Sequence, residues 1–163
     1  MSLSIALESP MSSDLDLLFL RHAADMHADT PPESIHMLPR EDLAAPDIAF
    51  FTIRDDGQPV AMGALKRLSG QPPVAEIKSM HVLAEHRGRG LSRLMLGVLI
   101  DHARSQGWSR LYLETGVQPS FAAARALYES AGFARCGPFQ GYAEDPNSLF
   151  LTLNLDTPAE STA

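Results

Sequence analysis

The stretch MHVLAEHRGRGLSRLMLGVLIDHARSQGWSRLYLET, residues 80–115, joins a strand-like segment, a cationic loop and a long amphipathic segment. The loop, EHRGRGLS at residues 85–92, carries three basic or near-basic side chains and two glycines. In the segment after it, apolar residues recur at the spacing of one helical face: Leu91, Leu94, Met95, Val98 and Leu99. This spacing predicts a helix from about Gly90 to Gln106, which Gly107 ends.

A loop of this kind at the start of a helix is typical of an anion-binding site. The first amides of a helix have no intrahelical partner, and the helix dipole puts partial positive charge at that end. Glycines let the backbone approach a ligand closely, and arginines add charged donors. The loop alone leaves open a plain turn with solvated arginines, or an RGG-type RNA-binding segment. The G-x-x-x-x-G-K-[ST] spacing of a nucleotide-binding P-loop is absent.

The composition narrows the classes of function. The chain has 163 residues, of which 45% are hydrophobic, and this size fits one globular domain. Its net charge of −7 argues against a general nucleic-acid-binding or membrane-surface protein. The single cysteine, Cys136, excludes an intrachain disulfide and a cysteine-based metal site, and we expect no metal. The first residues lack a signal-peptide pattern and no long apolar run occurs, so we expect a cytoplasmic protein without a membrane partner.

The remaining segments predict an α/β domain. Strands are expected near residues 3–9, 47–55, 58–68, 72–83, 109–115, 133–137 and 148–155, with Asp56-Gly57 as a hairpin turn. Helices are expected over residues 13–29, 40–43 and 120–132, with Ser13 and Ser120 as N-caps. In the first helix, the apolar contacts are expected from Leu17, Leu18, Leu20 and Met26. This order of elements predicts a mixed sheet with helices on both faces.

Two motifs carry a resemblance to a known family. Arg87-x-x-Gly90-x-Ser92 follows a strand that ends in Val, and ARALYESAGF at residues 124–133 contains Leu127-Tyr128 and then Gly132-Phe133. Together, in this order and at this separation, they resemble the GNAT superfamily of acyl-CoA-dependent N-acetyltransferases over about residues 74–135. The segments PPESIH, EIKSM, LETG and EDPNS also resemble a branch of small bacterial members. The resemblance implies a single GNAT-like domain over residues 1–155, with a mixed, mostly antiparallel sheet of about seven strands, followed by a disordered tail at 156–163.

The resemblance also implies where acetyl-CoA, the acyl donor, would bind. The backbone amides of the loop would hold its pyrophosphate, which assigns this role to Arg87, Gly88, Arg89, Gly90, Leu91 and Ser92. The fourth strand would splay from the fifth, so that backbone groups of Met80, His81 and Val82 pair with the pantetheine arm. One of these N–H groups would polarise the thioester carbonyl. The sequence departs from the pattern at Phe121, where many members carry Asn, and at Ser92, where a smaller residue is usual.

The implied reaction is direct attack of an amine on acetyl-CoA, which needs a group that takes the proton of the amine. Glu76 is the first candidate for this base, and His81 or a water chain is the alternative. Alternatively, Glu76 is a structural carboxylate on the face of the strand, paired with Lys78 or another cation. The resemblance places the hydroxyl of Tyr128 beside the leaving thiolate, although its ring also completes an apolar stripe. Cys136 is expected to fill space in a strand rather than to form an acyl-enzyme.

Two loop segments are expected to face the acceptor, TPPESIH at residues 30–36 and GYAEDPNS at residues 141–148. Glu33, with Glu144 and Asp145, would attract a cationic amine, and His36 and Lys78 would hold a carboxylate. These residues suggest a small, amino-acid-like acceptor. Two other functions stay open: an acyl-CoA-binding sensor or regulatory module without turnover, and a protein N-acetyltransferase. A homodimer is expected by analogy alone.

Overall fold

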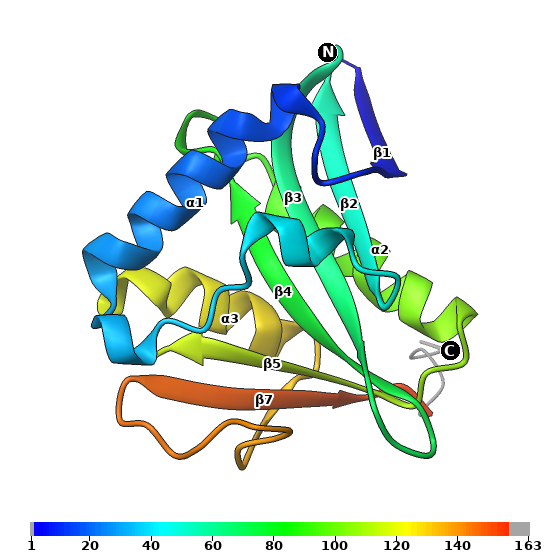
Figure 1. The fold of residues 1–163 in the computed structure, drawn as a ribbon, viewed down its shortest axis with the longest axis vertical. Helices are drawn as coiled ribbons and strands as arrows, with labels where there is room; N and C mark the ends of the chain where they lie inside the picture. The colour runs from blue at the N-terminus through cyan, green and yellow to red at the C-terminus, as the bar shows by residue number, and fades with distance from the viewer. Residues whose placement is uncertain (1, 157–163) are drawn as a thin grey trace.

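A computed structural model of the chain describes residues 2–156, and within them seven strands form one mixed sheet (Figure 1). The strand order is β1-β2-β3-β4-β5-β7-β6. The strands are β1 Leu3–Leu7, β2 Ile48–Asp55, β3 Gln58–Leu68, β4 Val74–Val82, β5 Arg110–Gly116, β6 Ala134–Cys136 and β7 Ser148–Asn154. The predicted mixed, mostly antiparallel sheet is therefore confirmed. From residue 157 on, the predicted tail lies outside the described residues.

The sheet opens between β4 and β5, its one parallel pair of strands among the described residues. These strands pair only from Val74 to Glu76 on β4 and from Arg110 to Tyr112 on β5. Beyond these residues they diverge toward their carboxyl ends, as Figure 1 shows. The backbone of β4 after Glu76 therefore keeps its β3 partner on one side and has no strand on the other.

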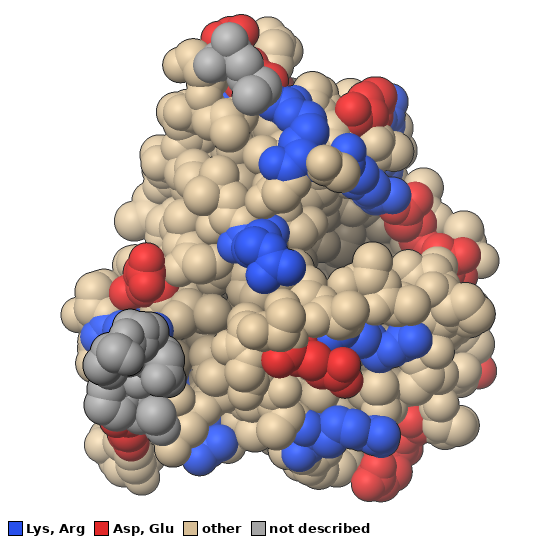
Figure 2. Space-filling view, turned by 180° about the vertical axis from the view of Figure 1, so that it is seen from behind, with Lys and Arg blue, Asp and Glu red and all other residues tan. Residues whose placement is uncertain are grey.

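Helices cover both faces of the sheet, as predicted (Figure 1). Helix α1, Asp16–Asp29, packs on one face, where Leu18 joins a core cluster with Phe50 and Met62. Helices α2, Leu91–Ser105, and α3, Ala122–Ser130, lie on the other face over the larger core cluster. Figure 2, which views the molecule from behind, shows basic and acidic side chains interspersed rather than gathered by sign. None of the helices within residues 2–156 combines the length and the apolar composition that a bilayer crossing requires.

A bulge in β4 decides which of its side chains face α1. Met62 of β3 pairs with His81 and Ala64 pairs with Lys78, so Gly63 stands opposite two residues of β4. At the bulge Ser79 takes a positive φ of 58°. Because an inserted residue reverses the alternation of side chains along a strand, His81 faces the same side of the sheet as Lys78 although the two are three positions apart.

Some local predictions were wrong. Ser13 and Ser120 are not N-caps: each lies inside a short 3₁₀ turn, Ser13–Leu15 and Pro119–Phe121, and the α-helix begins after it. Tight turns of this kind are frequent at helix starts. Leu17 and Leu20 of α1 are exposed, because the inner face of the helix carries Leu18, His22 and Met26 instead.

Candidate active site

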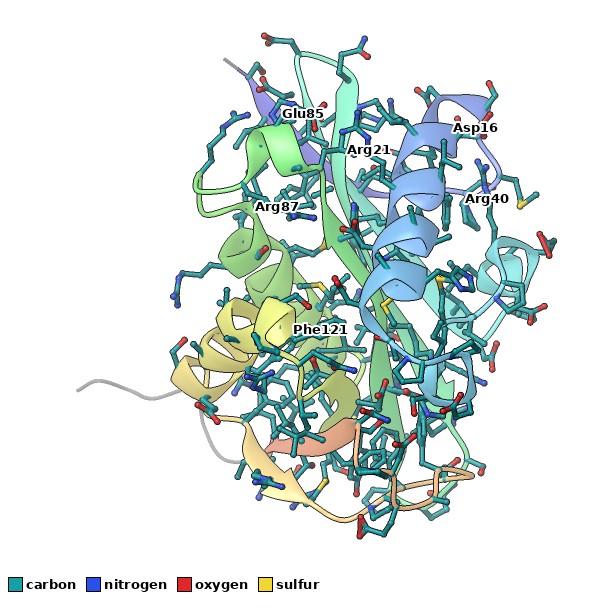
Figure 3. All side chains as sticks on the ribbon, turned by 90° about the vertical axis from the view of Figure 1, so that its left-hand side faces the viewer. Asp16, Arg21, Arg40, Glu85, Arg87 and Phe121 are labelled. Atoms are coloured by element: carbon teal, nitrogen blue, oxygen red, sulfur yellow. The ribbon has the colours of Figure 1, made fainter. Side chains whose placement is uncertain are left out.

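A cavity of about 650 Å³ fills the opening between β4 and β5 and continues on both sides of it. Its walls come from α1 and the segment after it, from β4 and the end of β5, and from the starts of α2 and α3. In Figure 3, α1 lies across from α2 and α3, with Arg87 on the loop that leads into α2 and Phe121 at the start of α3. The residues that line it include His22, Asp25, Thr30, Ser34, His36, Glu76, Lys78, Met80, His81, Val82, Arg87, Gly88, Gly90, Leu91, Ser92, Glu114, Phe121, Tyr128 and Asn147.

The predicted phosphate loop forms one end of this cavity. Gly88 and Gly90 have φ of 81° and 78°, a left-handed backbone that glycine adopts at no steric cost. A Cβ at either position would meet no atom within 4 Å, so the need for glycine is conformational. Gly90 is the N-cap of α2 and makes no side-chain cap, which leaves the first amides of the helix directed at the cavity end. This end of the cavity can bind an anion such as a pyrophosphate.

The two arginines of the loop lie in different environments. Arg87 lines the cavity, donates from Nε to the Val82 carbonyl at 3.0 Å, and pairs with Asp25 of α1 at 3.2 Å. The guanidinium of Arg89 turns to the β2–β3 hairpin, where it donates to Asp55 at 3.0 Å and to His86 Nδ1 at 2.6 Å. Arg89 is not among the residues that line the cavity. The Arg89 side chain therefore braces the loop, whereas Arg87, with Ser92 and Arg93 at the start of α2, adds side-chain donors at the anion end.

The β4 residues expected beside the pantetheine arm also line the cavity: Met80, His81 and Val82. They lie past the last β4–β5 pair, where β4 has no strand partner on that side. The His81 ring meets the ring of His22 of α1, with centroids 5.2 Å apart. Burial is the main cause that lowers the pKa of each to about 4. Both imidazoles are therefore neutral at pH 7.

Tyr128 of α3 is buried, and its side chain lines the cavity as well as packing against Phe133. Burial, with the nearby charge of Glu114, raises the pKa of Tyr128 to about 12. The phenol is therefore protonated at neutral pH and can donate a hydrogen bond. Phe121, just before the same helix, also lines the cavity. Its ring packs so closely on Gly116 that a Cβ there would be only 2.6 Å from a ring carbon. An apolar wall thus occupies the position where the family pattern has Asn.

Glu76 is buried on β4 and already has two donors. Lys78 Nζ lies 3.1 Å from Glu76 Oε2, and the Tyr142 hydroxyl donates to the same oxygen at 2.5 Å. This ion pair with Lys78 is the structural role for Glu76 that the sequence left open as an alternative to catalysis. Lys78 Nζ further donates to the Tyr142 oxygen at 2.9 Å and to the His36 carbonyl at 3.1 Å. Burial and the charge of Glu76 raise the pKa of Tyr142 well above its usual value.

Glu114 is a site residue that the sequence analysis missed. It lies on β5 just past the last residue pair with β4, lines the cavity, and accepts a hydrogen bond of 2.7 Å from Ser148 Oγ. Burial raises its pKa, while Ser148 and the charges of His36 and Lys78 act in the opposite direction. Nothing in the local sequence LYLET distinguishes Glu114 from an ordinary strand carboxylate. Its position on β5 beyond the last residue paired with β4 could have identified it, because the family resemblance already implied that these strands diverge.

The two segments expected to face the acceptor meet at the other end of the cavity. Ser34, in the turn Pro32–Ser34, donates to Asp145 Oδ2 at 2.6 Å, and Asn147 Nδ2 donates to Ser34 Oγ at 3.3 Å. The His36 ring lies against the Tyr142 ring, with centroids 4.9 Å apart. Glu33, by contrast, is exposed and is not among the cavity-lining residues. Within residues 2–156, no group of three His, Cys, Asp or Glu side chains is placed to hold a metal ion.

A cavity that can bind an anion at one end and has a carboxylate and a phenol further in fits a phosphate-bearing donor of a transferable group. The profile of the acetyltransferase (GNAT) family matches residues 17–133. The chain belongs to this family, and it is an acyl-CoA-dependent N-acetyltransferase that uses acetyl-CoA as its donor. The loop at Arg87–Ser92 and the unpaired part of β4 fit this donor.

Relatives and solved structures agree with this assignment. The chain is 44% identical over 134 residues to the uncharacterized N-acetyltransferase YsnE of Bacillus subtilis, covering 82% of this chain and 87% of that protein. It is 39% identical over 154 residues to an IAA acetyltransferase of Azospirillum brasilense, covering 92% and 96%. It is 36% identical over 117 residues to the N-alpha-acetyltransferase RimI of Mycobacterium tuberculosis, covering 71% of each.

The same fold occurs in a structure from Klebsiella pneumoniae described as an acyl-CoA N-acyltransferase, with a TM-score of 0.76 and 27% identity over 94% of this chain and 97% of that one. The acetyltransferase yncA of Salmonella typhimurium, solved with acetyl-CoA, shares the fold at a TM-score of 0.70 and 18% identity over 98% and 97% of the two chains.

Proposed function

We propose that this enzyme transfers the acetyl group of acetyl-CoA directly to the primary amine of a small molecule. The observation that carries the proposal is the single cavity that runs from the loop before α2, through the opening between β4 and β5, to Glu114 and the acceptor-side segments. Donor and acceptor can meet in it without an acyl-enzyme. Cys136 lies on β6 and is not among the residues that line the cavity.

The donor is held by the groups that the resemblance assigns. The amides from Arg87 to Ser92 bind the pyrophosphate, with the side chain of Arg87 beside them. Backbone groups of Met80 to Val82 bind the pantetheine arm, and one N–H polarises the thioester carbonyl, where negative charge develops during attack.

Tyr128 acts on the leaving sulfur. Its hydroxyl donates a hydrogen bond to the thiolate as the C–S bond breaks. Because its pKa is raised to about 12, full proton transfer to a thiolate of much lower basicity is unfavourable, and the hydrogen bond is its contribution.

The proton of the amine goes to a carboxylate, for which the cavity offers the expected Glu76 and the unexpected Glu114. We assign this role to Glu114. Oε2 of Glu76 is occupied by the hydroxyl of Tyr142 and by Lys78, whereas Glu114 has one donor, Ser148. Burial raises the pKa of Glu114, which brings this carboxylate closer to the range of a base that accepts a proton near neutral pH.

The acceptor end supports a small molecule. The contact between Ser34 and Asp145 joins the two acceptor-side segments, and Thr30, the first residue of one of them, is buried and lines the cavity. An amino-acid-like acceptor would use His36 or Lys78 for its carboxylate. Lys78, however, already donates to three protein oxygens, which favours an amine without a carboxylate. The relationship to an N-alpha-acetyltransferase supports a second candidate, transfer to a protein N-terminus.

A panel assay separates these functions. Release of free CoA is followed with acetyl-CoA and either small primary amines or peptides with free N-termini. Turnover on small amines and none on peptides supports the proposal. Turnover on peptides alone would replace it with protein acetylation. Binding of acetyl-CoA with no turnover on either set would return the protein to the sensor alternative. Sedimentation of the same sample tests the homodimer expected by analogy.

A further inference from the structure

Lys78 connects three separate parts of the chain through one buried ammonium group. Its side chain is 9% exposed. An ammonium group has three N–H donors. Nζ has three oxygen partners: Glu76 Oε2 at 3.1 Å, the Tyr142 hydroxyl at 2.9 Å and the His36 carbonyl at 3.1 Å. All three donors therefore have protein acceptors.

These acceptors belong to the floor and to two walls of the acceptor end. Glu76 lies on β4, His36 follows the turn Pro32–Ser34, and Tyr142 lies between β6 and β7. Glu76 and Tyr142 also bond each other at 2.5 Å, and the rings of His36 and Tyr142 are in contact. Lys78 thus fixes the distance of both wall segments from the strand that carries the donor site.

A buried ion pair of this kind needs a reason other than stability. Burying two charges costs desolvation that their attraction seldom exceeds, and apolar replacements of such pairs are often neutral or stabilising. A geometric role explains the pair better, because a single ammonium at this position reaches all three segments at once.

We propose that Lys78, with Glu76 and Tyr142, is a positioning residue that holds the two acceptor-side segments in place and so determines which amines fit. Lys78 does not bind the acceptor, and Glu76 is not the base. This inference rests on the proposed function, since it assumes an amine acceptor at this end of the cavity. It predicts that the enzyme prefers an amine to the amino acid that carries the same side chain.

The test compares Lys78→Met, Tyr142→Phe and the pair Lys78→Met/Glu76→Gln, in which no buried carboxylate loses its cation. Lys66→Met, the same change on the neighbouring strand β3, is the matched control. For an amine that the panel identifies, we expect KM for the amine to rise about tenfold or more in the three variants, because the two wall segments are no longer held in place and must be ordered when the amine binds. We expect kcat, its pH profile and the Kd for acetyl-CoA to stay near the wild-type values.

Other outcomes overturn the proposal. A large loss of kcat with a shifted pH profile in the variants that alter Lys78 or Glu76 would make the pair part of the chemistry. A wild-type preference for an amino acid over its decarboxylated amine, lost in Lys78→Met, would make Lys78 a carboxylate anchor.

Hydrogen exchange supplies a readout that needs no acceptor. In Lys78→Met we expect faster amide exchange in residues 31–38 and 139–147, and unchanged exchange in β5 and α2. Unchanged exchange in both wall segments would refute the positioning role even if no amine were acetylated. Failure of the panel, with acetyl-CoA bound, would instead count against the proposed function alone.

Discussion

Ser148, on β7, donates a hydrogen bond of 2.7 Å to the carboxylate of Glu114 on β5. This bond lowers the pKa of Glu114, against the burial that raises it. Ser148→Ala removes the lowering contribution, so the pKa of Glu114 rises further. If Glu114 takes the proton of the amine, the acid limb of kcat/KM moves to higher pH, because the base must be ionised to act. The measurement is the pH profile of kcat/KM. An acid limb that stays in place would separate Glu114 from the proton transfer.

Removal of the Tyr128 hydroxyl tests the contact to the leaving sulfur. In Tyr128→Phe the ring keeps its packing against Phe133, while the hydrogen bond to the thiolate is lost. We expect kcat to fall about a hundredfold or more, as for other donors aimed at developing charge. Isothermal titration with acetyl-CoA should give a nearly unchanged Kd. A matching fall in donor affinity with no change in kcat would assign Tyr128 to donor binding instead.

The two loop arginines should have separable effects. Arg87→Ala removes a side chain from the anion end and should weaken acetyl-CoA binding about three- to tenfold, since the group is partly exposed. Arg89→Ala takes away a partner of Asp55, and we expect about 1–2 kcal/mol of destabilisation, because a half-buried carboxylate then loses a charged donor. Calorimetric titration measures the acetyl-CoA affinity of both variants, and thermal melting measures their stability. Equal losses of donor affinity in both variants would contradict the different environments of their side chains.

The paired histidines predict a loss of stability in acid. The usual pKa is 6.5, and in the folded state burial holds His22 and His81 at about 4. Above pH 6.5 the two imidazole rings are neutral in both the folded and the unfolded chain, so they do not make the free energy of unfolding depend on pH. Between 6.5 and 4 the unfolded chain binds protons that the folded chain does not, so the free energy of unfolding decreases in that window, by up to roughly 3 kcal/mol for each ring. Urea melts at pH 7.5 and 4.5 measure this decrease.

The control for the histidine prediction is the double variant His22→Leu/His81→Leu. Its free energy of unfolding should change less between the two pH values than that of the wild type. An equal pH dependence in both proteins would assign the acid lability to other groups.

Local signals in the sequence predicted much of the fold. The turn at Asp56-Gly57 has the two positive φ values, 50° and 86°, that its residue types suggest. Helix α2 begins and ends within one residue of its predicted bounds, because an apolar stripe and two flanking glycines mark it. The starts of α1 and α3 were misplaced, because a serine near a helix start does not show whether a 3₁₀ turn comes first.

The parts of the site that the sequence did not predict depend on contacts between distant residues. The turn of Arg89 toward Asp55 joins positions 34 apart, and the contact of Lys78 with Tyr142 joins positions 64 apart. Glu114 is half-buried at the cavity because β5 continues past the end of its pairing with β4 and lies beside β7. The family resemblance assigns the donor end from a motif that is contiguous in sequence, and apart from Arg89 the residues it names line the cavity. The acceptor end is built from segments that carry no such motif.

In the proposed reaction, Glu114 takes the proton of a small amine that attacks acetyl-CoA in this cavity. Glu114→Gln keeps the size of the side chain and its contact with Ser148 while removing the base. The most direct measurement is the single-turnover rate of CoA release by wild type and Glu114→Gln at saturating donor and amine, beside Glu76→Gln. We predict that Glu114→Gln binds acetyl-CoA as wild type does but releases CoA about a hundredfold more slowly, with much smaller loss in Glu76→Gln. A wild-type rate in Glu114→Gln would mean that another group takes the proton of the amine.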